Sequence, residues 1–442
     1  MELTLQLYHG GTWHDAAVLT VERPELGING PTRIAYELDY FLEHGAIAFA
    51  ENKPVRDARA LSVNLPVSLE DTPRATWPPF LLDLLPQGFQ RKKIADYLKL
   101  NPEASSTELP LLMRTGGAPV GNVRIKEAFL EEAERLSGEA RTGLTMDDIL
   151  ERTDRFMDVV DRFAMIASGS SGLQGEWPKI ALTLGDDGKW YPDPMVEDSD
   201  ACNHIIVKLL RSNDEDDRLI LEAEAGYSAV AKEFGLAVEG TTTYRNGVLV
   251  ISRFDRAVEG GRFVRYGQES LVSAIDVAAF DHLDTHENYL QALRKYSTEP
   301  LLDIAEYVLR DLLNLAMGNP DNHGRNTALR KTEHGGIRLA PLYDFAPMRL
   351  ATAGIARSTK WDCMKAQGRD TAPDWRAVSE AAAGGDFPIQ KIMDALLAKE
   401  DLLRSLSAIA RKHAVPEVVI ERAMGRHLEV ASAVAELRHT LR

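Results

Sequence analysis

The feature that most constrains this fold is a segment, residues 301–317, whose pattern predicts one helix with a definite end. Its apolar residues recur at helical spacing and form one face: Ile304, Val308, Leu312 and Leu315. Gly318 follows directly, and glycine is the residue that most often ends a helix. A turn rich in Gly, Pro and Asn then runs from 318 to 326. A core helix that ends this way holds a polar loop in a fixed place.

That loop carries a set of side chains suited to phosphate chemistry. Asp321 and Asn326 lie within it, and Asp344 follows at the end of a short apolar run. Protein-kinase-like phosphotransferases use one carboxylate to orient the substrate hydroxyl, and an Asn and a second Asp to hold magnesium. Magnesium prefers such hard oxygen ligands. The same residue types also build ordinary turns, so the spacing alone leaves a plain polar loop open.

Composition sets outer limits on the function. The chain has 442 residues, more than one core usually supports, so we expect two or three compact units. Its net charge of −16 argues against direct, nonspecific binding to nucleic acid. The N-terminus lacks a signal-peptide pattern, and no apolar run approaches the roughly 18 residues of a membrane span. We therefore expect no membrane association. The only cysteines, Cys202 and Cys363, lie far apart, so we expect reduced thiols and a cytoplasmic location.

Periodicity predicts a strand-containing N-terminal half and a helical C-terminal half. Strands are expected at 3–8 and 58–66, where apolar and polar residues alternate. A helix is expected over 219–234, because helical spacing there ends at Gly235. The tail from 386 to 442 indicates three further amphipathic helices.

Four upstream features have both a functional and a plain reading. The Gly/Ser run at 167–175 could bring backbone N–H groups to phosphates, or could be a linker. Lys208, in a β-branched strand, could lie beneath nucleotide phosphates or point to solvent. Glu224, on the following helix, could fix that lysine as in kinases, or lie on the surface. The segment 250–256 could bind an adenine edge with its backbone, or be an edge strand. Their order along the chain is that of a kinase.

These residues resemble the HipA-type serine/threonine kinases, the toxin components of bacterial toxin–antitoxin pairs. The motifs that carry the resemblance are spread over nearly the whole chain: Ala60–Pro66, Asp83–Pro86, Gly116–Val123, His204–Lys208, Ser252–Arg256, Gly318–Asn326 and Tyr343–Asp344. The resemblance implies a two-lobed, protein-kinase-like α+β fold with a mixed α/β N-terminal lobe and an all-helical C-terminal lobe. It divides the chain into an N-terminal α/β subdomain at 1–145, a kinase N-lobe at 146–256 and a helical C-lobe at 257–442.

The resemblance also implies roles for individual residues. Asp321 would be the catalytic carboxylate, and Asn326 and Asp344 would hold Mg²⁺. The residues implied to bind ATP are Ser170, Ser171, Gly172, Gln174, Lys179, Lys208, Glu224, Ser252, Arg253, Phe254, Gln268 and His323. The neighbouring Glu269 belongs to the same motif as Gln268 and is implied to line the cleft.

Three departures from the family pattern accompany the resemblance. The phosphate loop has three additional residues before Lys179, so Ser168, Ser170 and Ser171 are all candidates for autophosphorylation. Ser252 stands where the family has Glu. Arg325 stands where the family has Lys, which keeps the charge and changes its geometry.

The implied function is an ATP- and Mg²⁺-dependent serine/threonine protein kinase. Its target would be a protein such as an aminoacyl-tRNA synthetase or another translation component, and its partner a small helix-turn-helix antitoxin through which alone it would reach DNA. Two other classes stay open. One is a metal-dependent hydrolase or nuclease using Asp321, His323 and Asp344. The other is a noncatalytic nucleotide-binding module that acts as a repressor.

Overall fold

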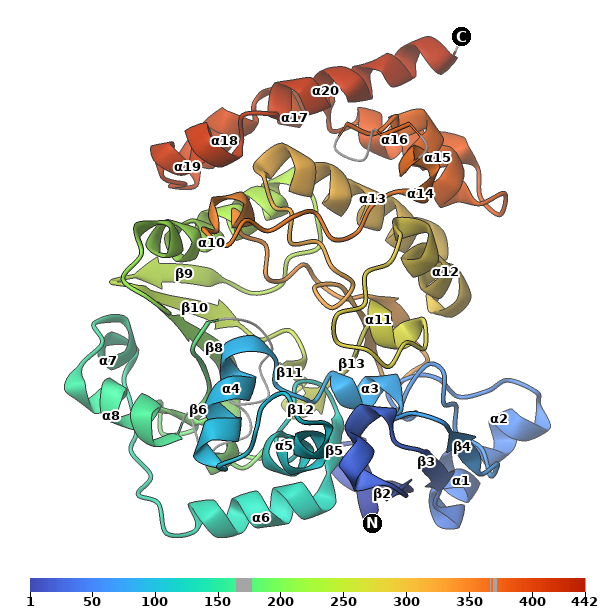
Figure 1. Ribbon diagram of the computed structural model, residues 1–442, viewed down its shortest axis with the longest axis vertical. Coiled ribbons are helices and arrows are strands. Elements are labelled where there is room, and N and C mark those ends of the chain that lie inside the picture. The colour runs from blue at the N-terminus through green and yellow to red at the C-terminus, as the bar shows by residue number, and fades with distance from the viewer. Residues whose placement is uncertain (164–176, 366, 369–371, 442) are drawn as a thin grey trace. The chain divides into compact units, whose positions relative to one another are not determined.

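The computed structural model describes residues 1–163, 177–365, 367–368 and 372–441 (Figure 1). The chain packs as two units, each built from several segments. Unit 1 comprises Met1–Arg211, Val250–Asp281 and Arg330–Gly336, and unit 2 comprises Ser212–Leu249, His282–Leu329 and Ile337–Arg442. The chain therefore crosses from one unit to the other several times. The contiguous division at 1–145, 146–256 and 257–442 stays a prediction.

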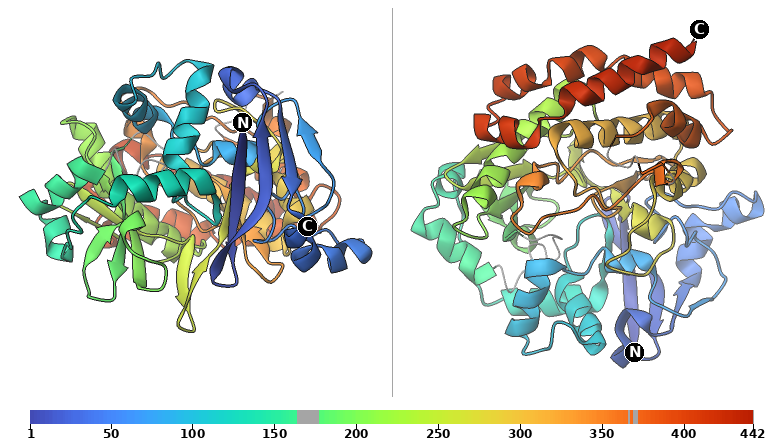
Figure 2. Two further views of the ribbon diagram at one scale, coloured as in Figure 1. Left: turned by 90° about the horizontal axis from the view of Figure 1, so that it is seen from below. Right: turned by 45° about the horizontal axis from the view of Figure 1, so that its top comes forward.

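Unit 1 begins with an antiparallel sheet of strand order β4-β3-β2-β1-β5. Its long hairpin joins β1 (Glu2–His9) to β2 (Thr12–Val21), and β3 (Thr32–Tyr36) lies beside β2 in the left view of Figure 2. The turn is Gly10–Gly11, with φ of +60° and +84°. Positive φ at both positions is the two-residue turn that matches the strand twist, and glycine adopts it without strain. The expected opening strand is confirmed.

The strand expected over 58–66 is wrong. The chain there forms turns with one isolated bridge, between Ser62 and Leu65. The physical reason is a buried carboxylate far along the sequence. Glu269 accepts hydrogen bonds from Ser62 Oγ at 2.5 Å and from Val63 N at 2.9 Å. Because the Val63 N–H bonds a side chain, it is not available to a neighbouring strand.

A second sheet of unit 1 places β7 (Trp190–Pro192), β6 (Lys179–Gly185), β8 (Ala201–Leu209) and β10 (Val248–Ser252) next to one another in that order. β10 carries the chain from unit 2 into unit 1. The other described elements of unit 1 are η1 (Pro24–Asn29), α1 (Leu38–His44), α2 (Ala46–Ala50), β4 (Thr72–Arg74), α3 (Pro79–Leu82), α4 (Gly88–Tyr97), η2 (Ser105–Thr107), α5 (Glu108–Thr115), β5 (Val123–Ile125), α6 (Lys126–Leu136), α7 (Met146–Leu150), α8 (Asp154–Phe163), η3 (Asp193–Met195), β11 (Arg256–Glu259), β12 (Arg262–Arg265), β13 (Gly267–Ser270) and α11 (Leu271–Ala274).

Unit 2 is built around two long helices, α10 (Glu215–Phe234) and α13 (Pro300–Met317). Both expected glycine stops are confirmed, because Gly235 and Gly318 follow these helices in the left-handed conformation. Three C-terminal helices pack on α13: α15 (Trp375–Ala383), α16 (Ile389–Leu397) and α20 (His427–Ala435) (Figure 1). The other described elements that lie in unit 2, wholly or in part, are β9 (Thr242–Arg245), α12 (His286–Tyr296), β14 (Ala328–Lys331), β15 (Ile337–Leu339), η4 (Met348–Leu350), α14 (Asp362–Lys365), α17 (Glu400–Arg404), α18 (Leu406–Lys412), α19 (Glu417–Ala423) and η5 (Glu436–Leu441).

Two expectations for the C-terminal half need correction. The α+β class is confirmed, but the part after 257 is not all helical, because β13, β14 and β15 lie within it. The described tail also has five α-helices, from α16 to α20, where three were expected. Short breaks near Ala398 and Ser405 divide what the apolar pattern indicated as longer helices. In the described residues, no helix has both the length and the apolar character needed to cross a membrane.

Gly318 is the position in unit 2 where glycine matters most. Its φ is +71°, and an added Cβ would lie 2.4 Å from the carbonyl oxygen of Ala423. Gly354 is a matched control, because its φ is +66° and a Cβ there would meet nothing within 4 Å. We expect Gly318→Ala to lower the free energy of unfolding by the backbone cost of about 1 kcal/mol plus about 1–3 kcal/mol for the clash. Gly354→Ala should show only the first contribution. Urea denaturation measures both, and equal losses would contradict the argument.

Candidate functional site

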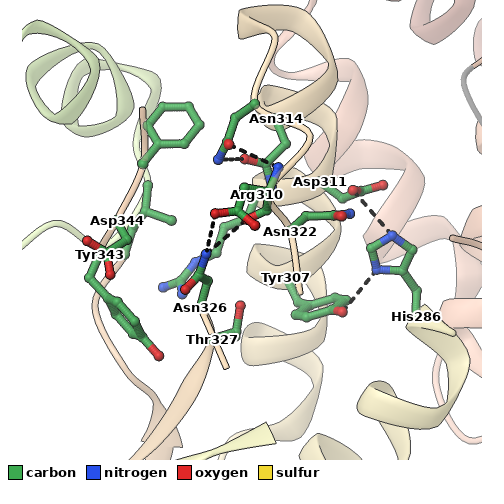
Figure 3. A pocket seen from close by; sticks show the side chains of 14 residues that line it. His286, Tyr307, Arg310, Asp311, Asn314, Asn322, Asn326, Thr327, Tyr343 and Asp344 are labelled. Carbon is green, nitrogen blue, oxygen red and sulfur yellow. Dashed lines mark hydrogen bonds and ion pairs between the residues drawn. The ribbon is translucent and has the colours of Figure 1, made fainter. Parts of the chain in front are cut away.

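A pocket in unit 2 gathers the polar side chains that the sequence indicates (Figure 3). About 420 Å³ of space lies between its walls, part of it open solvent. Its walls come from α13, from the loop that follows this helix, and from residues 342–345. Asp321, Asn326 and Asp344 all line it. The structure therefore brings together, in one unit, the three residues expected to carry phosphate transfer and magnesium.

The loop after α13 is folded upon itself by its own side chains. Asn326 Nδ2 donates to the backbone oxygen of Asp321 at 3.0 Å and lies 3.4 Å from its Oδ2. His323 Nε2 lies 3.5 Å from Oδ1 of the same carboxylate. Asn319 Oδ1 accepts from Asp321 N at 3.2 Å. Because the amide nitrogen of Asn326 is used inside the loop, its Oδ1 is the atom suited to ligate a cation.

Asp344 approaches the pocket from a second segment (Figure 3). Its φ is +49°, in the left-handed region that few residues other than glycine adopt. Next to it, the hydroxyl of Tyr343 donates to the carbonyl oxygen of Arg325 at 2.8 Å. This bond joins the second segment to the loop that holds Asn326. The two metal-ligand candidates are thus tied to each other through the backbone.

One wall of the pocket is organised around a buried carboxylate on α13. Asp311 accepts from Trp361 Nε1 at 2.8 Å, forms an ion pair with Arg357, and lies 3.3 Å from His286 Nε2. Figure 3 shows His286 between Asp311 and Tyr307, whose hydroxyl lies 2.9 Å from the other ring nitrogen. Burial alone would raise the pKa of Asp311, but Arg357 and His286 hold that pKa below its usual range. The group is therefore a carboxylate at neutral pH.

This wall is connected to the loop through hydrogen bonds. Arg357 Nε donates to the carbonyl oxygen of Thr359 at 3.1 Å. The backbone of Thr359 is in turn paired with the side chain of Asn322: Thr359 N donates to Asn322 Oδ1 at 3.1 Å, and Asn322 Nδ2 donates to Thr359 O at 3.0 Å. Through these contacts, the charge buried on α13 sets the path of the segment that supports the loop.

Sequence reasoning missed this support. His286, Tyr307 and Asp311 line the pocket but were not singled out. For Asp311 a signal was available, because it lies three residues after Val308 on the predicted apolar face. A charged residue in that position means either that the predicted apolar face is wrong or that the charge is buried and paired. For His286 and Tyr307 we find no comparable signal.

In unit 1, two lysines expected at the nucleotide lie directly opposite each other. Lys179 on β6 pairs in register with Lys208 on β8, and both side chains are buried. Directly opposed residues of neighbouring strands point to the same face. The structure therefore concentrates two positive charges on one face of the sheet. Glu224 is buried on α10 of unit 2, and its pairing with Lys208 stays a prediction.

Among the expected hinge residues, Arg253 lies in a buried cluster of ion pairs. The guanidinium of Arg253 is buried and bonded to Asp255 at 2.6 Å, and the neighbouring Arg256 is bonded to Asp193 at 2.6 Å. The backbone N–H of Arg253 donates to His204 O at 3.0 Å. The side chain of Arg253 therefore holds strands and loops together, and its expected contact with ATP stays a prediction.

Ser252, Phe254 and Gln268 are half-buried in unit 1, and their contacts with ATP stay predictions. Glu269, expected to line a cleft, is instead buried against Ser62, Val63 and Lys331, whose Nζ lies 3.4 Å from it. The phosphate-loop residues lie outside the described residues: Ser168, Ser170, Ser171, Gly172 and Gln174.

Comparison with known proteins shows which fold and which family models this chain matches. HipA of Shewanella oneidensis, solved in complex with HipB and its operator DNA, matches over 99% of both chains with a TM-score of 0.62 and 15% sequence identity. At that identity the likeness shows the fold alone, a kinase-like α+β fold. Residues 171–409 match the family model described as the HipA-like C-terminal domain, and residues 40–126 match the HipA N-terminal domain.

The chain therefore belongs to the HipA-like family. A relative from Sinorhizobium fredii, named "Putative kinase Y4mE", is 28% identical over 319 residues, which cover 68% of this chain and 72% of that protein.

The buried Asp311 generates a pH-dependent prediction. A carboxyl whose folded pKa lies below its unfolded value of about 3.9 contributes stability above that value and loses it as pH falls further. Asp311→Asn removes this contribution. We expect the difference in unfolding free energy between the native chain and Asp311→Asn to be full at pH about 6 and to shrink below pH about 4. Denaturant titrations across this range measure it. Asp401→Asn, at an exposed position on α17, should show no such change. A pH-independent difference for Asp311→Asn would contradict the assignment.

Proposed function

We propose that the chain is an ATP- and Mg²⁺-dependent serine/threonine protein kinase. The observation that carries this proposal is the convergence of Asp321, Asn326 and Asp344 on one pocket of unit 2. Two carboxylates and an amide oxygen are hard donors, which fit Mg²⁺ better than softer metals. The family membership and the kinase-like fold support the same reading.

Within this proposal each loop residue has a task. Asp321 orients the hydroxyl of the substrate and accepts its proton. Asn326 Oδ1 and the Asp344 carboxylate hold the metal, whose charge offsets the negative charge on the phosphates. The bonds from Asn326 and Asn319 keep the Asp321 backbone in place, so little reorganisation is needed when the substrate arrives. His323, beside Asp321, would contact the nucleotide.

The nucleotide would be held through unit 1. Lys179 and Lys208 present two ammonium groups on one face of their sheet, an arrangement that suits the polyanionic phosphates of ATP. The Gly/Ser segment before Lys179 would cover the phosphates with backbone N–H groups, and one of Ser168, Ser170 or Ser171 would be autophosphorylated. Backbone atoms near Ser252 and Phe254 would meet the adenine.

The proposal extends to location and partners. We infer a cytoplasmic enzyme that phosphorylates a protein, such as a component of translation, and thereby inhibits growth. The related HipA was solved with HipB and operator DNA. By analogy, a small helix-turn-helix antitoxin would bind this chain and provide its only route to DNA.

Replacement of the catalytic carboxylate tests the proposal directly. We expect Asp321→Ala to reduce transfer of labelled phosphate from ATP to proteins by about 10²- to 10⁴-fold, because it removes the base that orients the hydroxyl. Asp186→Ala, at an exposed turn position, is the control and should keep native activity. Circular dichroism establishes that both variants are folded. Transfer by Asp321→Ala at the native rate would refute the assignment. Metal-dependent cleavage of phosphodiesters by the native chain, with no transfer from ATP, would instead support the hydrolase alternative.

The two buried lysines generate a separate prediction for ATP affinity. Methionine is unbranched and only one heavy atom shorter than lysine, and it carries no charge. Loss of a charged hydrogen bond worth about 1.5–3 kcal/mol corresponds to about a 10- to 100-fold weaker Kd. We expect Lys179→Met and Lys208→Met each to raise the Kd for ATP by that factor, while Lys189→Met, at an exposed turn, leaves it unchanged. Equilibrium binding of a fluorescent ATP analogue measures the three constants. Native affinity in both buried variants would contradict the placement of ATP.

A further inference from the structure

Three histidines of unit 1 lie together, and none of them is among the residues assigned to phosphate transfer. His9 is the last residue of β1, His14 lies in β2, and His44 is the last residue of α1. Each offers one ring nitrogen, and these atoms lie within 4.8 Å of one another. In the part of the chain that the structure describes, this is the only cluster of three or more such metal-binding side chains.

Local structure explains why the three meet. In the hairpin register Leu7 pairs with His14, and His9 pairs with Thr12. His9 follows Leu7 by two residues, so its side chain lies on the same face as that of His14. The last turn of α1 adds His44, whose ring centroid lies 4.5 Å from that of His9. Residues distant in sequence thus supply one nitrogen cluster.

Hydrogen bonds fix which ring nitrogens are available. The Tyr40 hydroxyl donates to Arg59 O at 2.6 Å, so it accepts from His9 Nε2, which lies 3.0 Å away. His14 Nε2 donates to His9 O at 3.2 Å, because a carbonyl can only accept. Both rings therefore carry their proton on Nε2, and both Nδ1 atoms hold a lone pair. A ring N–H that donates to a carbonyl or hydroxyl is the usual support of a metal-binding histidine.

His44 provides the third nitrogen. Its Nε2 is buried and has no hydrogen-bond partner among the described residues, and its side chain is only 12% exposed. The nearest carboxylate oxygen, from Glu43, lies 3.8 Å away. Burial lowers the pKa of His9 to about 3 and that of His44 below its usual value, with the neighbouring histidines adding to the effect for both. Neutral imidazole is the form that binds metals.

We propose that His9 Nδ1, His14 Nδ1 and a ring nitrogen of His44 bind one divalent transition-metal ion, of which Zn²⁺ is the natural probe. Three imidazoles with a further position open to water or to Glu43 are a donor set that Zn²⁺ accepts. The ion would join the β1–β2 hairpin to α1, which already bonds β2 through the N–H of its N-cap residue Glu37 and the carbonyl oxygen of Ala16.

Aromatic packing alone explains less of the cluster. The rings of His9 and His14 stack at 4.0 Å with planes 6° apart, as two neutral rings can. Packing gives no reason for a buried ring nitrogen of His44 to lack a hydrogen-bond partner beside two other imidazoles. A cation would satisfy it. Because one ion cannot lie in the planes of two parallel rings, these rings must tilt apart when it binds.

The test uses the metal-free full chain and Zn²⁺ in competition with a chromophoric chelator. We expect one equivalent per chain, and an affinity at least about 100-fold weaker in His14→Gln and in His44→Gln, since loss of even a supporting residue costs about 10- to 100-fold. His334→Gln removes an exposed histidine of unit 1 and should bind as the native chain does. Absence of stoichiometric binding, or equal affinity in all three variants, would overturn the proposal.

A ligand exchange keeps the test decisive if a glutamine variant does not fold. His44→Cys replaces one nitrogen by a thiolate, and we expect its Co²⁺ complex to show a sulfur-to-cobalt charge-transfer band that the native Co²⁺ complex lacks. Tyr40→Phe removes the acceptor of the His9 N–H and should weaken Zn²⁺ binding by about 10-fold or more. A His44→Cys complex without that band would show that residue 44 is not a ligand. None of these readouts depends on phosphate transfer.

Discussion

The helices of unit 2 enclose one negative charge, the carboxylate of Asp311, and the rest of the unit has to neutralise it. The carboxylate of Asp311 is nearly inaccessible to solvent, and a buried charge without partners would cost several kcal/mol. Arg357, Trp361 and His286 supply those partners from two other segments. The requirement therefore dictates where residues 357–361 run, and this segment holds the loop through Asn322 and Thr359. The position of the candidate catalytic loop is thus a consequence of electrostatics on the helix that precedes it, as much as of the glycine that ends that helix.

Unit 1 also uses buried acidic side chains to hold irregular backbone, at two places. Glu269 accepts hydrogen bonds from the Ser62 hydroxyl and the Val63 N–H, and Asp193 and Asp255 hold Arg253 and Arg256 in a buried cluster. Burial would raise the pKa of Asp255, but Arg253 holds it below its usual range, so the pair is charged at neutral pH. A buried pair of this kind adds little net stability compared with apolar residues, yet removing one partner is costly. Its value lies in fixing one path for irregular backbone. Charged motif residues that look functional in sequence can therefore be architectural.

This distinction decides what the sequence could predict. The helices that end at Gly235 and Gly318 were predictable, because apolar spacing and a left-handed glycine are local signals. The three polar residues of the pocket were indicated by type and order, and the structure brings them together. The segment 58–66 was mispredicted because its hydrogen-bond partner, Glu269, lies some two hundred residues away. Asp311 was overlooked although it lies on the predicted apolar face, because its partners Arg357 and Trp361 are 46 and 50 residues away in the sequence. In both cases a buried acidic side chain is held by partners distant in sequence, and no local pattern records them.

The backbone at Asp344 adds an argument about the site that the pocket alone does not supply. A φ of +49° is cheapest for glycine, and Asp and Asn tolerate it better than other side chains do. A turn built only for geometry would therefore favour glycine here. The chain instead carries a carboxylate, accepts a local cost of about 1 kcal/mol or more, and steadies the position through the bond from Tyr343 to Arg325. Because the carboxylate lines the same pocket as Asp321 and Asn326, the proposed binding of a cation there would account for both its identity and its conformation.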